Sequence, residues 1–146
     1  MDKSKYSNHN CKKCSKNTLH RLVTATRGSY YVCVDCDREV KTRHRKKHWC
    51  RYLAQKANAR KVPNSEIITE TLVESIGYEQ RLRCALTGEC FDIESKWWKP
   101  SLDRIDSSKG YTSDNIRLVA WIVNHCRGEL SDSEFIDMCK KVSSKN

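Results

Sequence analysis

Residues 101–124, SLDRIDSSKGYTSDNIRLVAWIVN, combine a carboxylate, two asparagines and an arginine at spacings that could bind a divalent cation. The pattern predicts a β-β-α unit. Its first strand would lie at 102–105, the loop at 106–114, the second strand at 116–119, and the helix from 120 onward. Asp103 would end the first strand, and Asn124 would lie one turn into the helix. These two side chains could then share one ion, and their hard oxygen atoms suit Mg²⁺, Mn²⁺ or Ca²⁺ better than zinc.

The segment resembles the HNH (His-Me finger, ββα-metal) endonucleases over roughly residues 84–142. In that family the first strand ends in Asp-His, a middle Asn holds the loop, and a His or Asn on the helix completes the metal site. The resemblance implies that Asp103 and Asn124 bind a catalytic Mg²⁺ or Mn²⁺. It also implies that Asn115 orients the loop through hydrogen bonds to its backbone.

Arg104 stands where the family has its general-base histidine, and an arginine stays protonated at any working pH. The pattern Asp-Arg-x-Asp-x-x-x-Gly-Tyr-x-x-x-Asn is similar to a subgroup of rare-cutting restriction enzymes and phage endonucleases. That similarity implies that Arg104 holds the scissile phosphate while another residue activates the water. Asp106 and Tyr78 are our first candidates for the base. Four others stay open, namely Tyr111, His125, His44 and His48.

The composition favours a small basic protein with a polyanionic partner. The chain has 146 residues, 38% of them hydrophobic and 32% charged, with a net charge of +10 and a pI near 9.2. This length allows one modest domain and a small module, and nucleic acid is the commonest partner of such a basic chain. Because the sequence lacks an apolar run of membrane-spanning length and an apolar signal-peptide core, we expect a cytoplasmic protein of a bacterium or a phage-infected cell, with no membrane partner.

Two Cys-x-x-Cys pairs near the N-terminus are typical of a zinc ribbon, and their cysteines are Cys11, Cys14, Cys33 and Cys36. Four thiolates complete a closed tetrahedral site, so the zinc would be structural. The intervening segment predicts a strand, a turn and a strand at 19–23, 27–29 and 30–32. We expect His9 and His20 to lie on the surface. A redox dithiol pair is the lesser alternative.

Residues 42–61 predict a basic helix with an apolar stripe at every fourth residue from Trp49 to Ala57. The helix could lie across DNA phosphates, or it could be a solvated helix docked on the core. Our candidate DNA contacts are Arg43, Arg45, Lys46, Lys47, Arg51, Lys99 and Arg117. The adjacent Trp97 and Trp98 could stack bases or cover the core.

Two further helices are expected. Thr69 or Ser65 would cap an acidic helix that Gly77 ends, with a buried stripe formed by Leu72, Val73 and Ile76. Ser131 and Glu134 form a capping box before the last helix. This helix would close the small core through Phe135, Met138, Cys139 and Val142.

Some relatives in the family carry a second zinc, and here only one of its four ligand positions keeps a cysteine. These positions are Cys84, Thr87, Ala120 and Val123. We expect that the second zinc is lost and that packing takes its place. Cys90, Cys126 and Cys139 would then be small buried residues or bystanders, although Cys90 could rescue a distorted site with Cys84 and Cys126.

The fold class expected is α+β, with a zinc ribbon at 1–42, a helical connector at 43–80 and a ββα-metal core at 81–146. The expected function is a divalent-metal-dependent endonuclease that cuts double-stranded DNA. Cutting both strands requires two centres, which a homodimer would supply. The alternative is a non-catalytic, zinc-dependent nucleic-acid-binding protein with a decayed HNH site. A nuclease for RNA or for DNA junctions is a third option.

Overall fold

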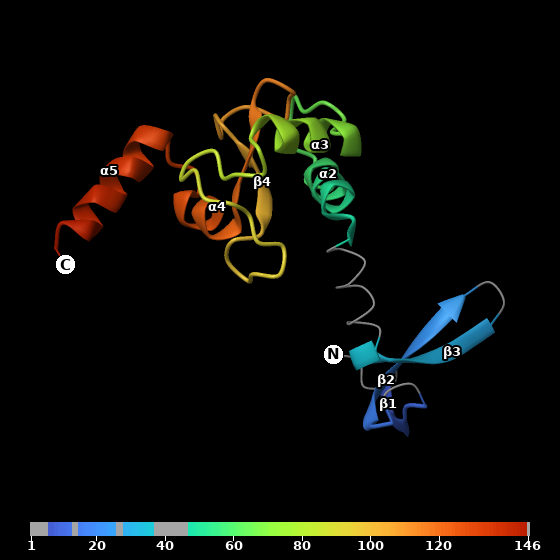
Figure 1. The fold of residues 1–146 in the computed structure, drawn as a ribbon. Coiled ribbons are helices and arrows are strands. Elements are labelled where there is room, and N and C mark those ends of the chain that lie inside the picture. Colours follow the sequence, from blue (N-terminus) through green and yellow to red (C-terminus); the bar gives the residue numbers. More distant parts are fainter. Residues whose placement is uncertain (1–5, 13–14, 26–27, 37–46, 146) are drawn as a thin grey trace. The chain divides into compact units, whose positions relative to one another are not determined.

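The computed structural model describes residues 6–12, 15–25, 28–36 and 47–145. The chain divides into two compact units, Met1–Lys47 and His48–Asn146, each with its own sheet (Figure 1). The protein is therefore a small mixed α+β fold with two small sheets, as the sequence predicted. None of the helices in the described part of the chain has both the length and the apolar character that a membrane span requires.

Unit 1 is a three-stranded antiparallel sheet in the order β1-β2-β3. Its strands are β1 (Tyr6–Asn10), β2 (Asn17–Ala25) and β3 (Gly28–Cys33). The register places His20 opposite Cys33, so the end of β3 lies beside the middle of β2. The two strands expected from the sequence are present as β2 and β3. The first strand was not expected, because its residues YSNHN are polar.

Unit 2 places two helices before a β-β-α segment and a final helix. Its elements are α2 (Trp49–Ala59), α3 (Glu70–Glu79), β4 (Pro100–Arg104), β5 (Ile116–Ala120), α4 (Trp121–Arg127) and α5 (Asp132–Ser143). The strands pair antiparallel, with Leu102 opposite Leu118 and Asp103 opposite Arg117. The expected strand, loop, strand and helix are thus present with nearly the expected bounds.

The helical connector belongs to the hydrophobic core of unit 2. Leu53 and Ala57 of α2 and Val73 of α3 are buried in one cluster with Leu102 of β4 and Leu118 of β5. The expected boundary near residue 80 is therefore wrong, because the apolar stripe of α2 packs against the strands. The charged residues of α2 are Arg51 and Lys56, and its apolar residues decide which side of the helix is buried.

Helix α3 begins at one of the two expected caps but ends later than expected. The Thr69 hydroxyl accepts a hydrogen bond from the Leu72 N–H at 3.1 Å, so Thr69 is the N-cap. Gly77 lies within the helix, where it packs against Trp49 and Leu118, and the helix continues to Glu79. The expectation that Gly77 ends the helix was wrong, because Gly77 does not take the left-handed backbone conformation of a glycine that ends a helix.

Helix α5 has the expected capping box, in which the Ser131 hydroxyl accepts from the Glu134 N–H and the Glu134 carboxylate accepts from the Ser131 N–H. Only Phe135 of its apolar residues is buried. Met138 is 38% exposed and Val142 is 63% exposed. The expectation that this helix closes the core therefore holds only for its first turn.

Candidate metal centre and nuclease-like site

Asn115 fixes the loop between β4 and β5. Its Nδ2 donates to the carbonyl oxygens of Asp106 at 3.0 Å and Gly110 at 2.9 Å, and its Oδ1 accepts from the Asp106 N–H at 2.9 Å. The side chain is buried, so these bonds are shielded from water. The hydrogen bonds expected of Asn115 are present, and any catalytic role for it stays a prediction.

The same loop is held from outside by the segment between α2 and α3. The Tyr111 N–H donates to the Ser65 hydroxyl at 2.9 Å, and the Tyr111 carbonyl accepts from the Glu66 N–H at 2.8 Å. A Cβ on Gly110 would clash with the Asn64 carbonyl and lie 2.7 Å from that of Pro63. Ser65 is thus a loop anchor and not the helix cap that the sequence also allowed.

Asn124 of α4 lies directly beside β4. Its Nδ2 donates to the Ser101 hydroxyl at 2.9 Å and to the Leu102 carbonyl at 3.1 Å. Leu102 immediately precedes Asp103, so the two residues expected to share an ion lie on neighbouring parts of the unit. The Asn124 Oδ1 accepts no hydrogen bond from the residues that the structure describes, which leaves this oxygen available as a ligand.

Asp103 is buried in a network with two arginines. The Arg127 Nη2 lies 3.0 and 3.2 Å from its two carboxylate oxygens, and the Arg117 Nε lies 3.0 Å from Oδ2. Arg117 also binds Asp132 of α5, with Nη1 donating to Oδ2 at 2.6 Å. Two carboxylates thus balance two guanidinium groups at the junction of β4, β5, α4 and α5.

Arg127 was not among the residues expected at the site. Its side chain is 1% exposed and also donates to the backbone carbonyls of Arg104 and Leu130. Its Nε is the one buried polar side-chain atom without a hydrogen bond in the described part of the chain. The sequence feature that could have identified Arg127 is its position three residues after Asn124, which places both residues on one face of the helix.

Arg117 is not placed on the surface where a DNA contact would need it. Its side chain is largely buried and binds Asp103 and Asp132, both of which raise the pKa of its guanidinium against the opposing effect of burial. The expectation for Arg117 was wrong because its alternation along β5 turns it toward Asp103, the residue opposite in the sheet.

The donors of Asp103 and Asn124 fit a hard divalent ion in type. A carboxylate offers about four lone-pair positions, and Arg117 and Arg127 use Asp103 through three hydrogen bonds. Mg²⁺ commonly takes one or two protein carboxylates and completes its shell with water and phosphate. The arginines compete for the carboxylate, so an ion would have to share Asp103 with them.

Arg104 lies at the end of β4 beside the loop. Its Nη1 donates to the Lys109 carbonyl at 2.8 Å, and its guanidinium carbon lies 5.4 Å from the centre of the Tyr111 ring. Arg60 of the α2 C-cap also lies over that ring and donates to the Tyr111 hydroxyl. Tyr111 is buried between two guanidinium groups, which fits the expected packing role.

The two candidate bases have different surroundings. The Asp106 carboxylate accepts from the Ser108 hydroxyl at 2.6 Å, from the Ser108 N–H at 3.0 Å and from Lys109 at 3.5 Å. These contacts, the Ser108 hydroxyl first, lower the pKa of Asp106, which weakens it as a base. Tyr78 of α3 is 86% exposed, and no hydrogen bond joins it to Asp103 or Asn124 among the described residues.

Of the remaining histidine candidates, His125 and His48 lie within the described residues. His125 stacks on Trp121 with ring centres 4.9 Å apart. His48 precedes α2, and His44 lies outside the described residues.

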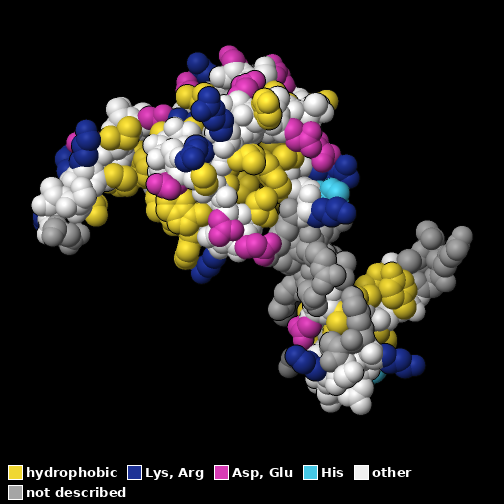
Figure 2. Space-filling model, viewed as in Figure 1, with side chains coloured by type: hydrophobic (Ala, Val, Ile, Leu, Met, Phe, Trp, Pro, Cys, Tyr) yellow, Lys and Arg dark blue, Asp and Glu magenta, His cyan; other side chains and the backbone are white. Residues whose placement is uncertain are grey.

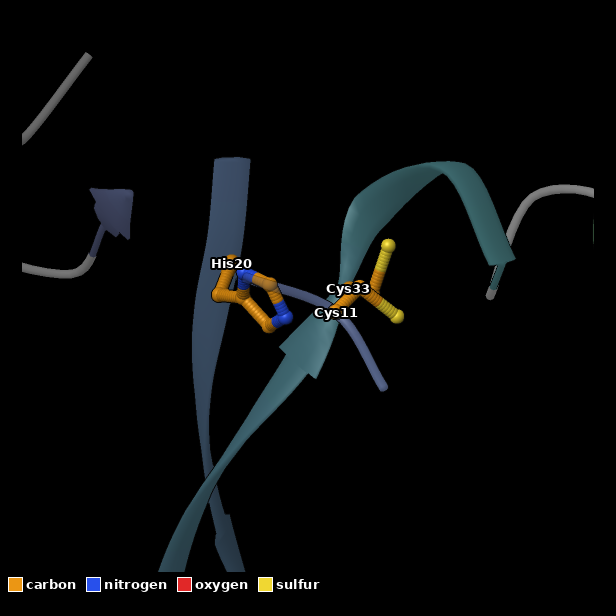
Figure 3. A group of neighbouring side chains, drawn as sticks. All are labelled: Cys11, His20 and Cys33. Atoms are coloured by element: carbon orange, nitrogen blue, oxygen red, sulfur yellow. The ribbon is translucent and has the colours of Figure 1, made fainter. Parts of the chain in front are cut away.

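Unit 1 contains a buried cysteine and histidine cluster. The ligand atoms of Cys11, His20 and Cys33 all lie within 4.8 Å of one another (Figure 3). The Cys11 and Cys36 sulfurs are 3.7 Å apart, close to the roughly 3.8 Å that tetrahedral zinc imposes on two thiolates. The group could hold a metal ion. Cys14, the fourth expected ligand, lies outside the described residues.

His20 was expected on the surface, and this was wrong because the β2–β3 register turns it toward Cys33. Its Nδ1 lies 2.9 Å from the Thr18 carbonyl oxygen. A carbonyl only accepts, so Nδ1 carries the proton and Nε2 keeps its lone pair. This is the usual arrangement of a metal-binding histidine.

The surroundings of Cys33 favour the thiolate form of its side chain over the thiol. Its pKa is lowered to about 6, chiefly by the Thr18 hydroxyl 3.1 Å from the sulfur, and also by the Cys36 N–H. Since metals bind thiolates, a lowered pKa favours metal binding near neutral pH.

The other cysteines divide by environment. Cys84 is buried with Val119, Ala120, Val123 and Phe135, and the loss of a second zinc stays a prediction. Three cysteines are exposed and are therefore not the small buried residues that the sequence also allowed, namely Cys90, Cys126 and Cys139. Among the described residues they join no metal-like cluster.

Several candidate DNA contacts remain on the surface. Lys47 and Lys99 are exposed, and Arg51 binds Glu70 of α3 at 2.7 Å. Arg43, Arg45 and Lys46 lie outside the described residues.

Comparison with protein-family models, curated proteins and solved structures found no match.

Proposed function

We propose that the protein is a divalent-metal-dependent endonuclease that hydrolyses phosphodiester bonds in double-stranded DNA. The observation that supports this most is the β4–β5–α4 unit. It holds Asn124 against the residue before Asp103 and closes the loop after Arg104 through Asn115. The basic composition of the chain suits the proposed partner.

Each residue of the proposed site has a task that its chemistry allows. Asp103 and Asn124 would hold Mg²⁺ or Mn²⁺, which when bound stabilises charge on the phosphate oxygens. Arg104 would bind the scissile phosphate by a charge-assisted hydrogen bond. Asn115 would keep the loop in place. Asp106, one of the two predicted bases, lies on this loop.

The cluster of Cys11, Cys33 and Cys36 with His20 would hold a structural Zn²⁺, with Cys14 as a further candidate ligand. Thiolate and imidazole ligands suit zinc better than Mg²⁺. A closed zinc site would stabilise unit 1, where the buried apolar residues among those described are Cys11, Cys33 and Cys36.

A second candidate function has one observation in its favour. The Asp103 carboxylate is engaged by Arg117 and Arg127, as it would be in a site that no longer binds a metal. The protein would then be a zinc-dependent nucleic-acid-binding protein without catalysis.

Incubation with supercoiled plasmid separates the two functions. We expect nicking or linearisation that needs Mg²⁺ or Mn²⁺ and is lost in Asn124→Ala, a variant that leaves the buried ion pairs intact. Asp114→Ala is the control, because Asp114 is an exposed carboxylate on the β4–β5 loop that accepts a hydrogen bond from the Thr112 hydroxyl. Intact plasmid with every divalent ion, together with retained gel-shift binding, would establish the non-catalytic reading.

A further inference from the structure

Three aromatic rings form a row beside α4, which we call the aromatic row: Trp97, Trp121 and His125. The Trp97 and Trp121 ring centres are 5.5 Å apart, and the rings are tilted by 40°. Trp121 and His125 are 4.9 Å apart and almost parallel, with an angle of 9° between their planes. The row therefore presents stacked π-faces drawn from a loop and a helix.

Two lysines lie against the same rings. The Lys96 Nζ is 4.3 Å from the centre of the Trp97 ring, and the Lys99 Nζ is 5.5 Å from that of Trp121. Such cation–π contacts keep positive charge beside the aromatic faces. The loop also carries Asp92 and Glu94, and the charged groups that lie over the rings in the described residues are the two lysines.

Backbone hydrogen bonds fix the loop that carries Trp97. The Trp97 carbonyl accepts from the Ile122 N–H at 3.0 Å, and the Lys99 carbonyl accepts from the Trp121 N–H at 2.9 Å. The Ser95 hydroxyl accepts from the Trp97 N–H at 3.1 Å. The rings are thus ordered before any partner binds, which lowers the entropy lost on binding.

The aromatic row lies outside the hydrophobic core. Trp97 is 43% exposed and His125 is exposed, and neither they nor Trp121 belong to the core clusters of the described residues. Figure 2 shows hydrophobic side chains gathered on the surface of unit 2 over the region of α4 and its neighbouring loop. Core packing therefore does not account for these rings.

A partner with flat π-faces and negative charge matches this surface. Unpaired nucleobases stack on aromatic side chains whatever their sequence, while their phosphates bind nearby lysines. Paired bases in a duplex expose mainly their edges in the grooves. We propose that the aromatic row stacks unpaired bases of a single-stranded segment and that Lys96 and Lys99 bind its phosphates. This inference rests on the proposed function only in taking nucleic acid as the partner.

The test is the fluorescence anisotropy of a labelled oligothymidylate and of a duplex, each titrated with full-length protein without added divalent ion. We expect Trp97→Ala and Trp121→Ala to raise the Kd for the single strand about tenfold, or about 1.4 kcal/mol, within the range of base stacking. Trp97→Phe and Trp121→Phe should keep most of the affinity, because phenylalanine also stacks. The phenylalanine variants and far-UV circular dichroism distinguish a loss of base stacking from a loss of folding.

Matched controls come from the same surface and from α5. Trp98→Ala removes a neighbouring tryptophan that is 38% exposed and outside the row, and it should leave the Kd unchanged. Lys96→Gln should weaken binding more than Lys140→Gln, which removes an equal charge from α5. Equal affinities of Trp97→Ala and Trp98→Ala would overturn the proposal, as would an equal loss for duplex and single strand.

The two proposals fail separately. If plasmid stays intact while Trp97→Ala loses single-strand affinity, the nuclease proposal fails and the stacking surface stands. If Asn124-dependent nicking occurs while the Trp97 and Trp121 variants bind the single strand like the wild type, the stacking surface alone is wrong.

Discussion

The buried Arg127 of α4 should contribute more to the stability of unit 2 than a surface arginine such as Arg51. We predict that Arg127→Met destabilises unit 2 by about 3–5 kcal/mol, the range for breaking a buried ion pair by removing one partner. Methionine keeps much of the apolar length but leaves Asp103 with Arg117 alone. It also removes the hydrogen bonds to the carbonyls of Arg104 and Leu130.

These losses overlap and should not be added. An unsatisfied buried acceptor alone costs about 1–3 kcal/mol, and groups in one network couple strongly. Arg127→Lys should lie between the wild type and Arg127→Met, because it keeps a charge but loses the planar fork. Arg51→Met is the control, since the Arg51–Glu70 pair is exposed and such pairs contribute at most about 1 kcal/mol.

Urea unfolding followed by tryptophan fluorescence measures this effect in unit 2 alone, because Trp49, Trp97, Trp98 and Trp121 all lie in it. The free energy of unfolding comes from linear extrapolation. A value for Arg127→Met within about 1 kcal/mol of the Arg51→Met control would refute our reading of the network as tightly coupled.

Three further predictions concern acid stability, the loop and the metal cluster. Hydrogen bonding to Arg117 lowers the pKa of Asp132. The stabilisation from the ionised Asp132 is therefore present above the ordinary aspartate pKa of about 3.9 and is lost as the pH falls through the pKa in the folded protein. Urea titrations at decreasing pH should show that Asp132→Asn loses less stability in acid than the wild type, and an equal loss would contradict this. Asn115→Ala should cost about 2–4 kcal/mol, since three hydrogen bonds are lost, and an unfolding curve like that of the wild type would exclude the loop-holding role. His20→Ala should release bound zinc to a chromogenic chelator faster than His9→Ala, whereas equal rates would show that His20 is not a ligand.

The parts of the fold that depend on local sequence were predictable. Strand alternation and turn residues identify the β-β-α segment, and Ser131 and Glu134 identify the start of α5, because caps are made within one turn. The hydrogen bonds of Asn115 followed from the family resemblance. They join residues at most nine positions apart.

The parts that depend on distant contacts were not predictable. The burial of His20 requires the β2–β3 register, and the Asp103–Arg127 pair joins a strand to a helix across 24 positions. Charge patterns say that Arg117 and Arg127 are basic but not which way they face. Composition likewise hides the core side of α2, where small residues such as Ala54 and Ala57 are buried.

The close fit of Gly110 against the chain between α2 and α3 limits how this protein can be dissected. An excised fragment starting at Cys84 would keep Asp103, Arg104, Asp106, Asn115 and Asn124, yet it would lack the segment that shapes the loop. Fragments meant to retain the site should therefore begin no later than His48. In a saturation library, position 110 should admit glycine alone.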